Sequence, residues 1–524
     1  MNQNLQNAGY VKTDNITANY GIERLIISGV INCIFGLAVL VGLKSLGIPM
    51  LVAVLIALFL AIVGVVLLTK RLPSELIGIR KRKPWVSTIW FLIALVAVLQ
   101  TTRLSIFMID SSQTQHSLFP GDQWMIEHCC LTAYNESAKF VDEGEKNIYD
   151  IRLYLEKIDN KNSIDSTPFR KVAGFKVDLY HYPPPFLLLP IMAQAITGGE
   201  FLNLRMLWFS ISVLSLMIAL GFIFYHLEPD GRLRLIGMGP LIWCSMPVLA
   251  GLQMSNVQII VIAISIIAMA LFSINRPIGG ILLAMSSVAK IFPGILFVYV
   301  IAQRKFREAL WIAGFAVVLS IIALMVVGLN PFQAFIEYEL PKLSSGEAFS
   351  RPFSIVFAVA RNMAPFGIPI KLGWLGVPGM TLEIGRLVSS VHLMMVIILA
   401  IWSGRQKPRT NTEMISVWIS LLALGSLVSP FAPANYVLIT VILLVCLNRE
   451  IFRPWAVLNI WLLICIPFFI SREAPFLIQA ISFLPAQIIA IAAPAYVLYR
   501  AGLRTTVEEN IISKSSIAHE LSKD

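Results

Sequence analysis

Residues 51–85 read LVAVLIALFLAIVGVVLLTKRLPSELIGIRKRKPW. The part from Leu51 to Leu68 is wholly apolar, and a helix that spans a bilayer needs roughly 20 such residues. The part that follows holds six basic residues: Lys70, Arg71, Arg80, Lys81, Arg82 and Lys83. Basic loops stay on the cytoplasmic side of a membrane. This one stretch therefore predicts a transmembrane helix and the side on which it ends.

The composition extends this prediction to the whole chain. Its 524 residues are 57% hydrophobic and 14% charged, with a mean hydropathy of +0.77. We therefore predict an all-α, polytopic integral membrane protein with about 12–14 transmembrane helices. The net charge of +11 would suggest a nucleic-acid partner in a soluble protein. Here the basic residues cluster in short loops between apolar runs, so we expect a bilayer and no nucleic acid.

The alternation of apolar runs and basic loops predicts an ordered set of regions. They are a cytoplasmic tail (1–23), three transmembrane helices (24–108), an external loop with juxtamembrane helices (109–204), a transmembrane bundle (205–328), a second external loop with a half-buried segment (329–379), further transmembrane helices (380–499) and a cytoplasmic tail (500–524). The pattern leaves open whether residues 186–196 and 355–374 cross the membrane.

The stretch VDLYHYPPPFLLLP, residues 177–190, opens one of these ambiguous segments. Proline lacks a backbone N–H and disfavours helix in the residue before it, so three prolines in succession predict a rigid, extended start. A full crossing here would place later basic loops on the wrong side. We therefore expect a shallow or re-entrant helix on the outer face, which presents Asp178, Tyr180, His181 and Tyr182 to a site.

Lys290 interrupts another apolar segment, RPIGGILLAMSSVAKIFPGILFVYVIAQRKFR, residues 276–307. Basic residues at both ends and the Lys-Ile-Phe-Pro break predict two short helices that meet at Lys290 on the outer side. A charge inside a membrane is costly, which marks this lysine as functional. The alternative is a lysine at a helix end whose ammonium extends to the interface.

Metal and cofactor motifs are not evident. Only the adjacent Cys129 and Cys130 lie in a polar loop, no zinc-ligand spacing is present, and the large loop has no Asp-x-Asp pair. The chain has no glycine-rich phosphate loop either, which argues against a nucleotide-sugar donor. We therefore expect no cofactor, and the sequence leaves open whether a divalent cation takes part.

Five motifs resemble, in order, those of a known family. They are SAKFVDEGEKNIYD (137–150), HYPPPFLLLP (181–190), LAGLQMSNVQIIVIAISIIAMALF (249–272), SVAKIFPGILFVYVIAQRKFREAL (287–310) and LVSPFAPANYVLITVILL (427–444). Together they resemble the GT-C membrane glycosyltransferases of family 87, a mannosyltransferase-like group that depends on polyprenyl-phosphate sugars. The resemblance covers roughly residues 103–447.

The resemblance implies an inverting transfer of a sugar from a polyprenyl-phosphate donor to a lipid, glycolipid or glycan acceptor. It also implies a location in the cell inner membrane, with the active site facing the periplasm. A carboxylate would take the proton of the acceptor hydroxyl. Cationic groups would stabilise the departing lipid phosphate.

For the base, the resemblance points to Asp122 in FPGDQW, because family members place an essential aspartate in this loop. The interval from Asp122 to the motif at 137–150 is longer than is usual in the family, so Asp142, Glu136 and Glu127 compete for the role. Asp122 also fits the N-cap of a helix that begins at the next residue.

For binding of the phosphate and the sugar, we expect residues on the same outer face. These are Lys290, Arg205, Arg351, His181, Tyr182, Gln253 and Asn256. Two other functions compete: an oligosaccharide polymerase or ligase, whose main external loop usually comes late in the chain, and a transporter or flippase, which would carry ionisable groups along a midplane path.

Overall fold

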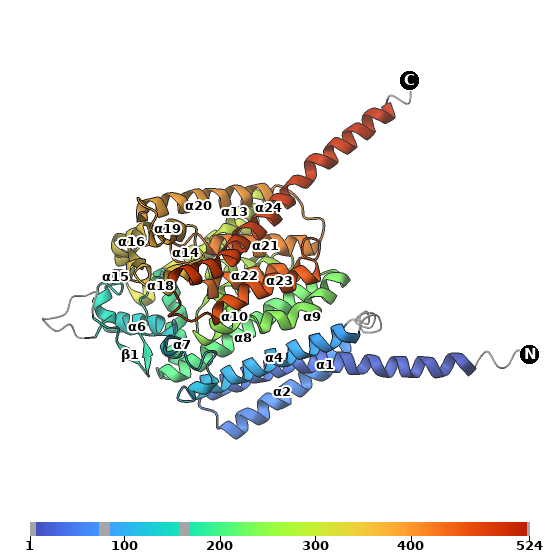
Figure 1. The fold of residues 1–524 in the computed structure, drawn as a ribbon, viewed down its shortest axis with the longest axis horizontal. Coiled ribbons are helices and arrows are strands. Elements are labelled where there is room, and N and C mark those ends of the chain that lie inside the picture. Colours follow the sequence, from blue (N-terminus) through green and yellow to red (C-terminus); the bar gives the residue numbers. More distant parts are fainter. Residues whose placement is uncertain (1–6, 73–83, 157–166, 521–524) are drawn as a thin grey trace, which may run out of the picture.

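The computed structural model describes residues 7–72, 84–156 and 167–520, and the side chains within 23–72, 85–156 and 167–503. The predicted basic residues Arg80 to Lys83 lie outside the described residues. The chain folds as a helical bundle, with the described strands confined to one small hairpin (Figure 1).

Seven helices are long and apolar enough to cross a membrane. Their spans are Glu23–Ser45 within α1 (Asn7–Ser45), Met50–Arg71 (α2), Trp85–Ile109 within α4 (Pro84–Ile109), Phe201–His226 (α8), Phe306–Val327 (α14), Leu382–Gly404 (α20) and Phe476–Leu503 within α24 (Phe476–Glu520). The shortest has 22 residues and is therefore about 33 Å long, which exceeds the roughly 30 Å hydrocarbon core. The prediction of an all-α polytopic membrane protein is confirmed.

Two further helices with a bend between them are together long and apolar enough to form an eighth span. Helix α9 (Pro229–Trp243) and helix α10 (Met246–Gln253) meet at an angle of 54°. Pro247 stands in the first turn of α10 and has no backbone N–H to continue the hydrogen bonding of α9, which explains the break.

The interior of the bundle contains shorter helices. They are α11 (Gln258–Leu271), α12 (Arg276–Ala289), α13 (Ile295–Ala302), α21 (Asn411–Ser426), α22 (Ala434–Leu447) and α23 (Pro454–Cys465), the last continued by the 3-10 turn η9 (Ile466–Phe469). Helices α11 and α22 are buried over nearly their whole length. Fourteen residues span about 21 Å, less than the hydrocarbon thickness. These helices leave room at one end of the bundle, and the first large loop packs there.

That loop folds into short elements. They are η2 (Thr114–His116), α5 (Gln123–Glu127), α6 (Leu131–Asp142), η3 (Ile151–Tyr154), β1 (Lys171–Val172), β2 (Phe175–Lys176), η5 (Pro184–Leu187) and α7 (Leu188–Ile196). The two strands form an antiparallel hairpin whose turn residues, Ala173 and Gly174, both have positive φ, as a two-residue hairpin turn of type I′ requires. The proline segment continues as η5 and α7, which together are shorter than the helices that can span.

The second loop lies at the same end of the bundle (Figure 1). Its elements are α15 (Asn330–Ala334), the π-helical turn η7 (Phe335–Glu339), α16 (Leu340–Ser345), η8 (Glu347–Phe349), α17 (Ser350–Phe353), α18 (Val356–Arg361) and α19 (Gly367–Trp374). The ambiguous segment 355–374 is therefore broken between α18 and α19 and forms no continuous spanning helix. His181 Nδ1 lies 2.6 Å from Glu339 Oε1, and this contact joins the two loops.

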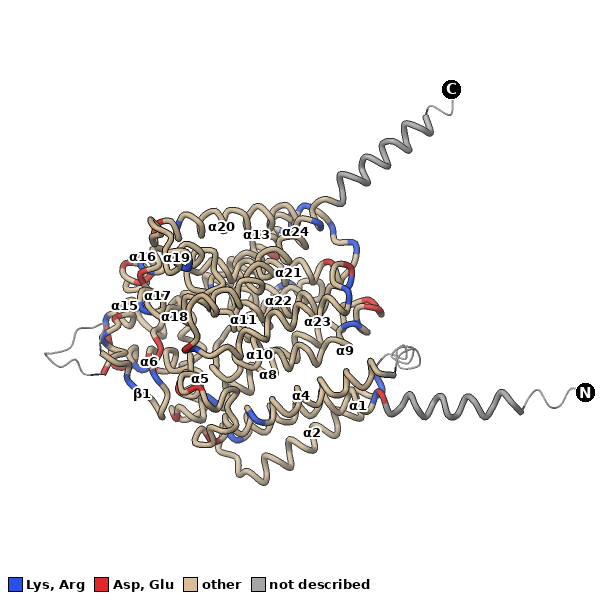
Figure 2. The backbone as a smooth tube through the Cα atoms, viewed as in Figure 1, with Lys and Arg blue, Asp and Glu red and all other residues tan. Residues whose placement is uncertain are grey.

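Charged residues gather at the two ends of the bundle (Figure 2). Acidic and basic residues mix at the end that carries α6, β1 and α15, while basic residues are prominent at the end where α20 and the spanning part of α24 finish. The zone between them is largely uncharged, as expected for the part of a protein that lies in hydrocarbon.

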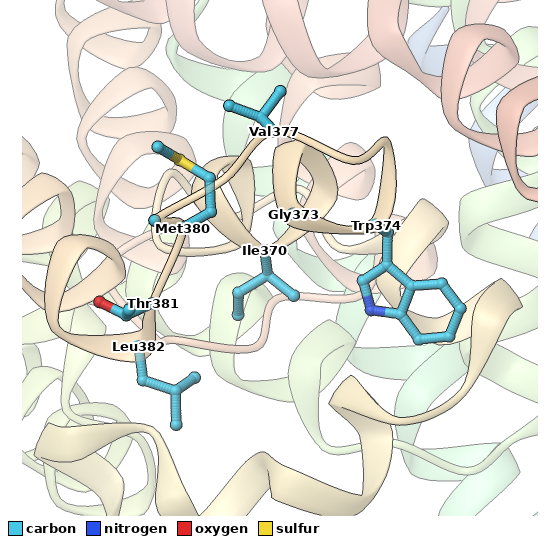
Figure 3. Close-up of a pocket in the computed structure, with 8 residues that line it drawn as sticks. Ile370, Gly373, Trp374, Val377, Met380, Thr381 and Leu382 are labelled. Atoms are coloured by element: carbon cyan, nitrogen blue, oxygen red, sulfur yellow. The ribbon is translucent and has the colours of Figure 1, made fainter.

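One hollow of about 490 Å³ opens beside the connection from α19 to α20 (Figure 3). Ile370, Trp374 and Leu382 are among the residues that line it. The connection turns at Gly376 and Gly379, whose φ angles of 89° and 78° suit glycine. None of the residues predicted for the site lines this hollow.

The fold predicts that the two charged ends face opposite sides of the membrane. Exposed Glu145 lies in the first large loop and exposed Lys407 lies between α20 and α21. Cysteines introduced as Glu145→Cys and Lys407→Cys should react with an impermeant maleimide from opposite sides of sealed vesicles. The wild-type chain, with its six cysteines, sets the background. Labelling of both variants from one side would contradict the arrangement.

Candidate active site

The centre of the site is the ammonium of Lys290. Helix α12 ends at Ala289, Lys290 is extended (φ −139°, ψ 131°), and Pro293 lies in the 3-10 turn η6 (Phe292–Gly294) that follows. The Nζ atom donates a hydrogen bond to Gln258 Oε1 at 2.7 Å and lies 3.5 Å from Asn256 Oδ1.

Two aromatic rings complete the surroundings of this ammonium. The ring centroids of Tyr182 and Tyr436 lie 5.4 and 5.7 Å from Lys290 Nζ, within the range of cation–π attraction. Among the described residues, no ion pair joins Lys290 to a carboxylate. The positive charge is thus solvated by neutral groups and remains available to an anion.

The two amide partners are placed by the junction between α10 and α11. Ser255 adopts a left-handed backbone conformation (φ 52°), which is uncommon for a residue with a side chain and is often found at functional sites. The Asn256 side chain accepts the backbone N–H of Gln258 at 2.9 Å. This local bond orients Asn256 and starts α11, so both amide oxygens face the lysine.

The tyrosines bring two of the sequence motifs together. Tyr149, from the NIYD motif, donates its hydroxyl hydrogen to the backbone carbonyl of Tyr182 at 2.9 Å. The hydroxyls of Tyr134 and Tyr182 lie 2.9 Å apart, and the Phe186 ring packs on Tyr182 with centroids 4.8 Å apart. Burial raises the pKa of Tyr182, so its hydroxyl keeps its proton. The proline segment therefore lies beside Lys290 as part of an aromatic wall, which consists of Tyr134, Tyr182, Phe186 and Tyr436.

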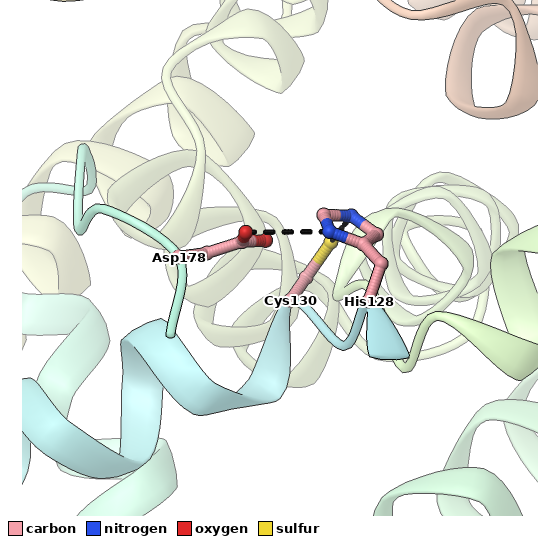
Figure 4. Close-up of side chains that lie close together, drawn as sticks. All are labelled: His128, Cys130 and Asp178. Atoms are coloured by element: carbon pink, nitrogen blue, oxygen red, sulfur yellow. Dashed lines mark hydrogen bonds and ion pairs between the residues drawn. The ribbon is translucent and has the colours of Figure 1, made fainter. Parts of the chain in front are cut away.

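Next to this wall, His128, Cys130 and Asp178 come together (Figure 4). His128 Nδ1 lies 3.3 Å from Asp178 Oδ1, and His128 Nε2 lies 3.6 Å from Cys130 Sγ. Cys130 Sγ also lies 2.8 Å from the hydroxyl of Tyr436, which connects this cluster to the surroundings of Lys290.

The pKa of His128 is set by opposing influences. Burial is the largest single one and lowers the pKa, but the charges of Asp178 and Cys130 and their hydrogen bonds together outweigh it. The net pKa lies above that of an ordinary histidine, which favours the imidazolium beside these acidic groups.

Asp122 lies at the start of α5, as its capping pattern predicts. Its Oδ1 accepts the backbone N–H of Met125 at 3.2 Å, and its Oδ2 accepts a hydrogen bond from Arg472 Nε. The Arg472 guanidinium lies 3.8 Å from the centroid of the Trp124 ring, which itself stacks on His128 with centroids 4.0 Å apart. Asp122 is therefore linked to the His128 cluster through two side chains.

The competing carboxylates of the loop have other surroundings. Glu127 pairs with Lys171 at 2.8 Å, and hydrogen bonds led by the one from Lys171 hold its pKa at about 2. Glu136 is buried and pairs with Arg170 at 2.7 Å. Asp142 is exposed at the end of α6.

Two more predicted site residues, Gln253 and Arg205, are buried and form hydrogen bonds with backbone groups of the first large loop and of α4, respectively. The Gln253 side chain accepts the backbone N–H of Leu118 at 2.5 Å and donates to the carbonyl of Met125 at 2.8 Å. Arg205 is fully buried, donates to the carbonyl of Phe107 at 3.0 Å and lies against the Phe107 ring.

The structure therefore brings Lys290, Asn256 and Tyr182 together, while Arg351 and His181 make contacts elsewhere. Arg351 donates to the carbonyl of Thr167 at 3.1 Å in the outer loops, and His181 contacts Glu339. Three further members of the site were not in the predicted set: Gln258, Tyr436 and Cys130. Gln258 and Tyr436 do lie inside recognised motifs, whereas only the three-dimensional arrangement identifies Cys130.

The fold and the site define a multi-pass, all-α membrane protein with a buried cation beneath the first large loop. A family model, described as Glycosyltransferase family 87, matches residues 180–430. This match confirms the resemblance seen in the motifs and supports a membrane glycosyltransferase. No curated protein and no solved structure matches the chain. The matched range includes Tyr182, Asn256 and Lys290, whereas Asp122 precedes it.

The contacts of Asp122 predict how its variants change stability. Asp122→Asn keeps a cap acceptor but loses the charge that pairs with Arg472, and Asp122→Ala loses both contacts. The cap alone contributes about 1 kcal/mol. The midpoint of thermal denaturation in detergent should therefore fall in the order wild type, Asp122→Asn, Asp122→Ala. Asp142→Ala, at an exposed position, should melt like the wild type. An unchanged midpoint for Asp122→Ala would contradict the structural role.

Proposed function

We propose that the protein transfers a sugar, mannose or another hexose or pentose, from a polyprenyl-phosphate donor to a hydroxyl of a lipid, glycolipid or glycan acceptor. The observation that carries this proposal is the Lys290 ammonium, held by neutral amide oxygens and aromatic rings beneath the external loop. The match of residues 180–430 to glycosyltransferase family 87 supports the same reaction class.

Lys290 is proposed to bind the phosphate that leaves with the lipid. An ammonium in an apolar bundle is unfavourable unless it is hydrated or paired. Gln258 and Asn256 replace part of its hydration without neutralising its charge. A lipid phosphate would supply the missing counter-charge, and the attraction would strengthen as negative charge develops during departure.

The aromatic wall is proposed to bind the sugar. Tyrosine rings offer apolar faces, and their hydroxyls donate and accept hydrogen bonds. Tyr182 and Tyr436 combine these properties with positions beside Lys290. The sugar would therefore lie between the phosphate-binding lysine and the loop that carries the carboxylates.

The chemical step is a single displacement. The acceptor oxygen attacks the anomeric carbon as the bond from that carbon to the phosphate oxygen breaks, and the configuration inverts. The hydroxyl proton passes to a carboxylate, and the electron pair of the broken bond leaves with the phosphate. Asp122 is the base that the family resemblance favours. Its carboxylate accepts two hydrogen bonds and has further lone pairs that can accept the acceptor hydroxyl.

Asp178 is the alternative base that the arrangement favours. It lies beside His128, and Cys130 and Tyr436 connect that histidine to the surroundings of Lys290. We further propose that the reaction takes place at the periplasmic face of the cell inner membrane. The loops that surround the site would lie on that side, opposite the basic end.

The proposal predicts a large effect of removing the Lys290 charge. Lys290→Gln should lower transfer from labelled polyprenyl-phosphate sugars by about 10²–10³-fold, because stabilisation of the leaving phosphate is lost. Lys290→Arg should retain more activity than Lys290→Gln. The matched control is Lys146→Gln, at an exposed lysine of the first large loop, which should transfer like wild type. Transfer at the wild-type rate by Lys290→Gln would contradict the assignment. Absence of transfer by the wild type itself, tested with a panel of such donors, would argue against the donor class.

The base is tested by a pair of isosteric variants. Asp122→Asn should lower transfer by about 10²–10⁴-fold, the usual contribution of general-base catalysis. Asp142→Asn serves as the exposed control. If Asp122→Asn transferred normally and Asp178→Asn did not, Asp122 would be excluded as the base.

A further inference from the structure

We propose that His128, Cys130 and Asp178 bind a divalent transition-metal ion, for which Zn²⁺ is the best match, with an open coordination position toward the Lys290 site. One ligand atom from each residue can be chosen so that all three lie within 4.8 Å of one another. Local spacing rules miss this set because Asp178 lies far along the chain from His128 and Cys130.

The donor set suits zinc. A neutral imidazole nitrogen, a thiolate and a carboxylate oxygen are its usual protein ligands, at distances of about 2.0–2.3 Å. Zinc-bound atoms are then separated by roughly 3.3–3.7 Å around a tetrahedron. The His128 Nε2 to Cys130 Sγ distance of 3.6 Å already falls in this range.

Charge balance favours the same ion. A thiolate and a carboxylate supply two negative charges, and neutral imidazole supplies none, so Zn²⁺ makes the assembly neutral. A neutral assembly avoids much of the cost of burying separate charges. Upon binding, the Cys130 thiol and the His128 imidazolium would each lose a proton to solvent, as metal coordination of cysteine and histidine requires.

The backbone holds the three residues close together before any ion binds. The Cys130 N–H donates to the carbonyl of Met254 at 2.8 Å. Thr132 accepts the Asp178 N–H at 3.0 Å, which fastens the Asp178 segment to the start of α6. Trp124 stacks on the His128 ring. Such supporting contacts are what a preformed metal site needs.

The open position would face the proposed substrate. The Tyr436 hydroxyl lies 2.8 Å from Cys130 Sγ, and the Tyr436 ring lies beside Lys290. A site with three protein ligands keeps a fourth position for water or substrate. If the proposed function holds, the open position of the ion would accept an oxygen of the departing phosphate, as a Lewis acid does. This last role rests on that function and makes Asp178 a metal ligand, which leaves Asp122 as the base, whereas the metal site itself does not rest on it.

Co²⁺ binding by the purified full-length protein in detergent tests the site. Wild type should bind one Co²⁺ with a thiolate-to-cobalt charge-transfer band in the near ultraviolet, and Zn²⁺ should abolish the band. Cys130→Ser should lose the band, and His128→Gln should bind Co²⁺ at least 100-fold more weakly. The control is Cys129→Ser, at the adjacent buried cysteine outside the cluster, which should behave like wild type. Gel-filtration and circular-dichroism profiles establish that the variants fold.

Several results would overturn the proposal. These are no Co²⁺ binding by wild type, a charge-transfer band that persists in Cys130→Ser, or alkylation of Cys130 at the same rate with and without Zn²⁺. The last result would instead indicate a metal-free thiol paired with His128. Metal binding is measured without sugar transfer, so a protein that binds Co²⁺ but transfers no sugar would contradict only the proposed function. Full transfer by a metal-free protein would remove the catalytic role of the ion.

Discussion

The ammonium of Lys290 is a charge inside the bundle, and the surrounding structure supplies the polar and aromatic groups that stabilise it. A charge in an apolar bundle needs groups that replace its hydration. Those groups come from the start of α11, the start of α22 and the proline segment, and they converge where α12 stops. Because the partners are amides and phenols instead of carboxylates, the site keeps its positive charge. This arrangement differs from an internal ion pair that only stabilises the fold, and it supports the proposal that the site receives an anion.

The first large loop is part of the bundle and not a separate cap. The inner helices α11 and α22 have only 14 residues each, too few to cross on their own, and the loop packs at one end of the bundle beside them. Gln253 joins α10 to the backbone of the loop in two places. Tyr149 fastens the carbonyl of Tyr182 immediately before the three prolines. The rigid prolines and this bond together explain how a segment without regular structure holds Tyr182 beside Lys290.

The family match and the geometry bear on different parts of the site. The matched range, residues 180–430, holds the cation, its amide partners and Tyr182. The loop carboxylates Asp122 and Asp178 precede that range. The resemblance therefore supports the proposed phosphate-binding part more directly than the choice of base. Contacts within this chain, such as the Arg472 pair of Asp122, bear more directly on that choice.

Local properties of the chain were enough to predict much of this protein. Apolar runs and basic loops reveal membrane helices because hydropathy and charge act over one segment at a time. The helix break at Lys290 could also be predicted from local sequence, because a proline three residues later interrupts the helix. The capping role of Asp122 also depends only on its neighbours in the chain.

The tertiary structure decided which distant side chains meet. Arg472 reaches Asp122 across 350 residues, and Tyr436 reaches Cys130 across 306. Asp178 meets His128 because Thr132 holds its backbone against α6. Such pairs depend on how whole helices and loops pack. The spacing of residues along a chain does not predict that packing, so it does not predict which distant side chains meet. The sequence thus determined the all-α, multi-pass class and the helix break at Lys290, while packing alone brought histidine, cysteine and aspartate together beside it.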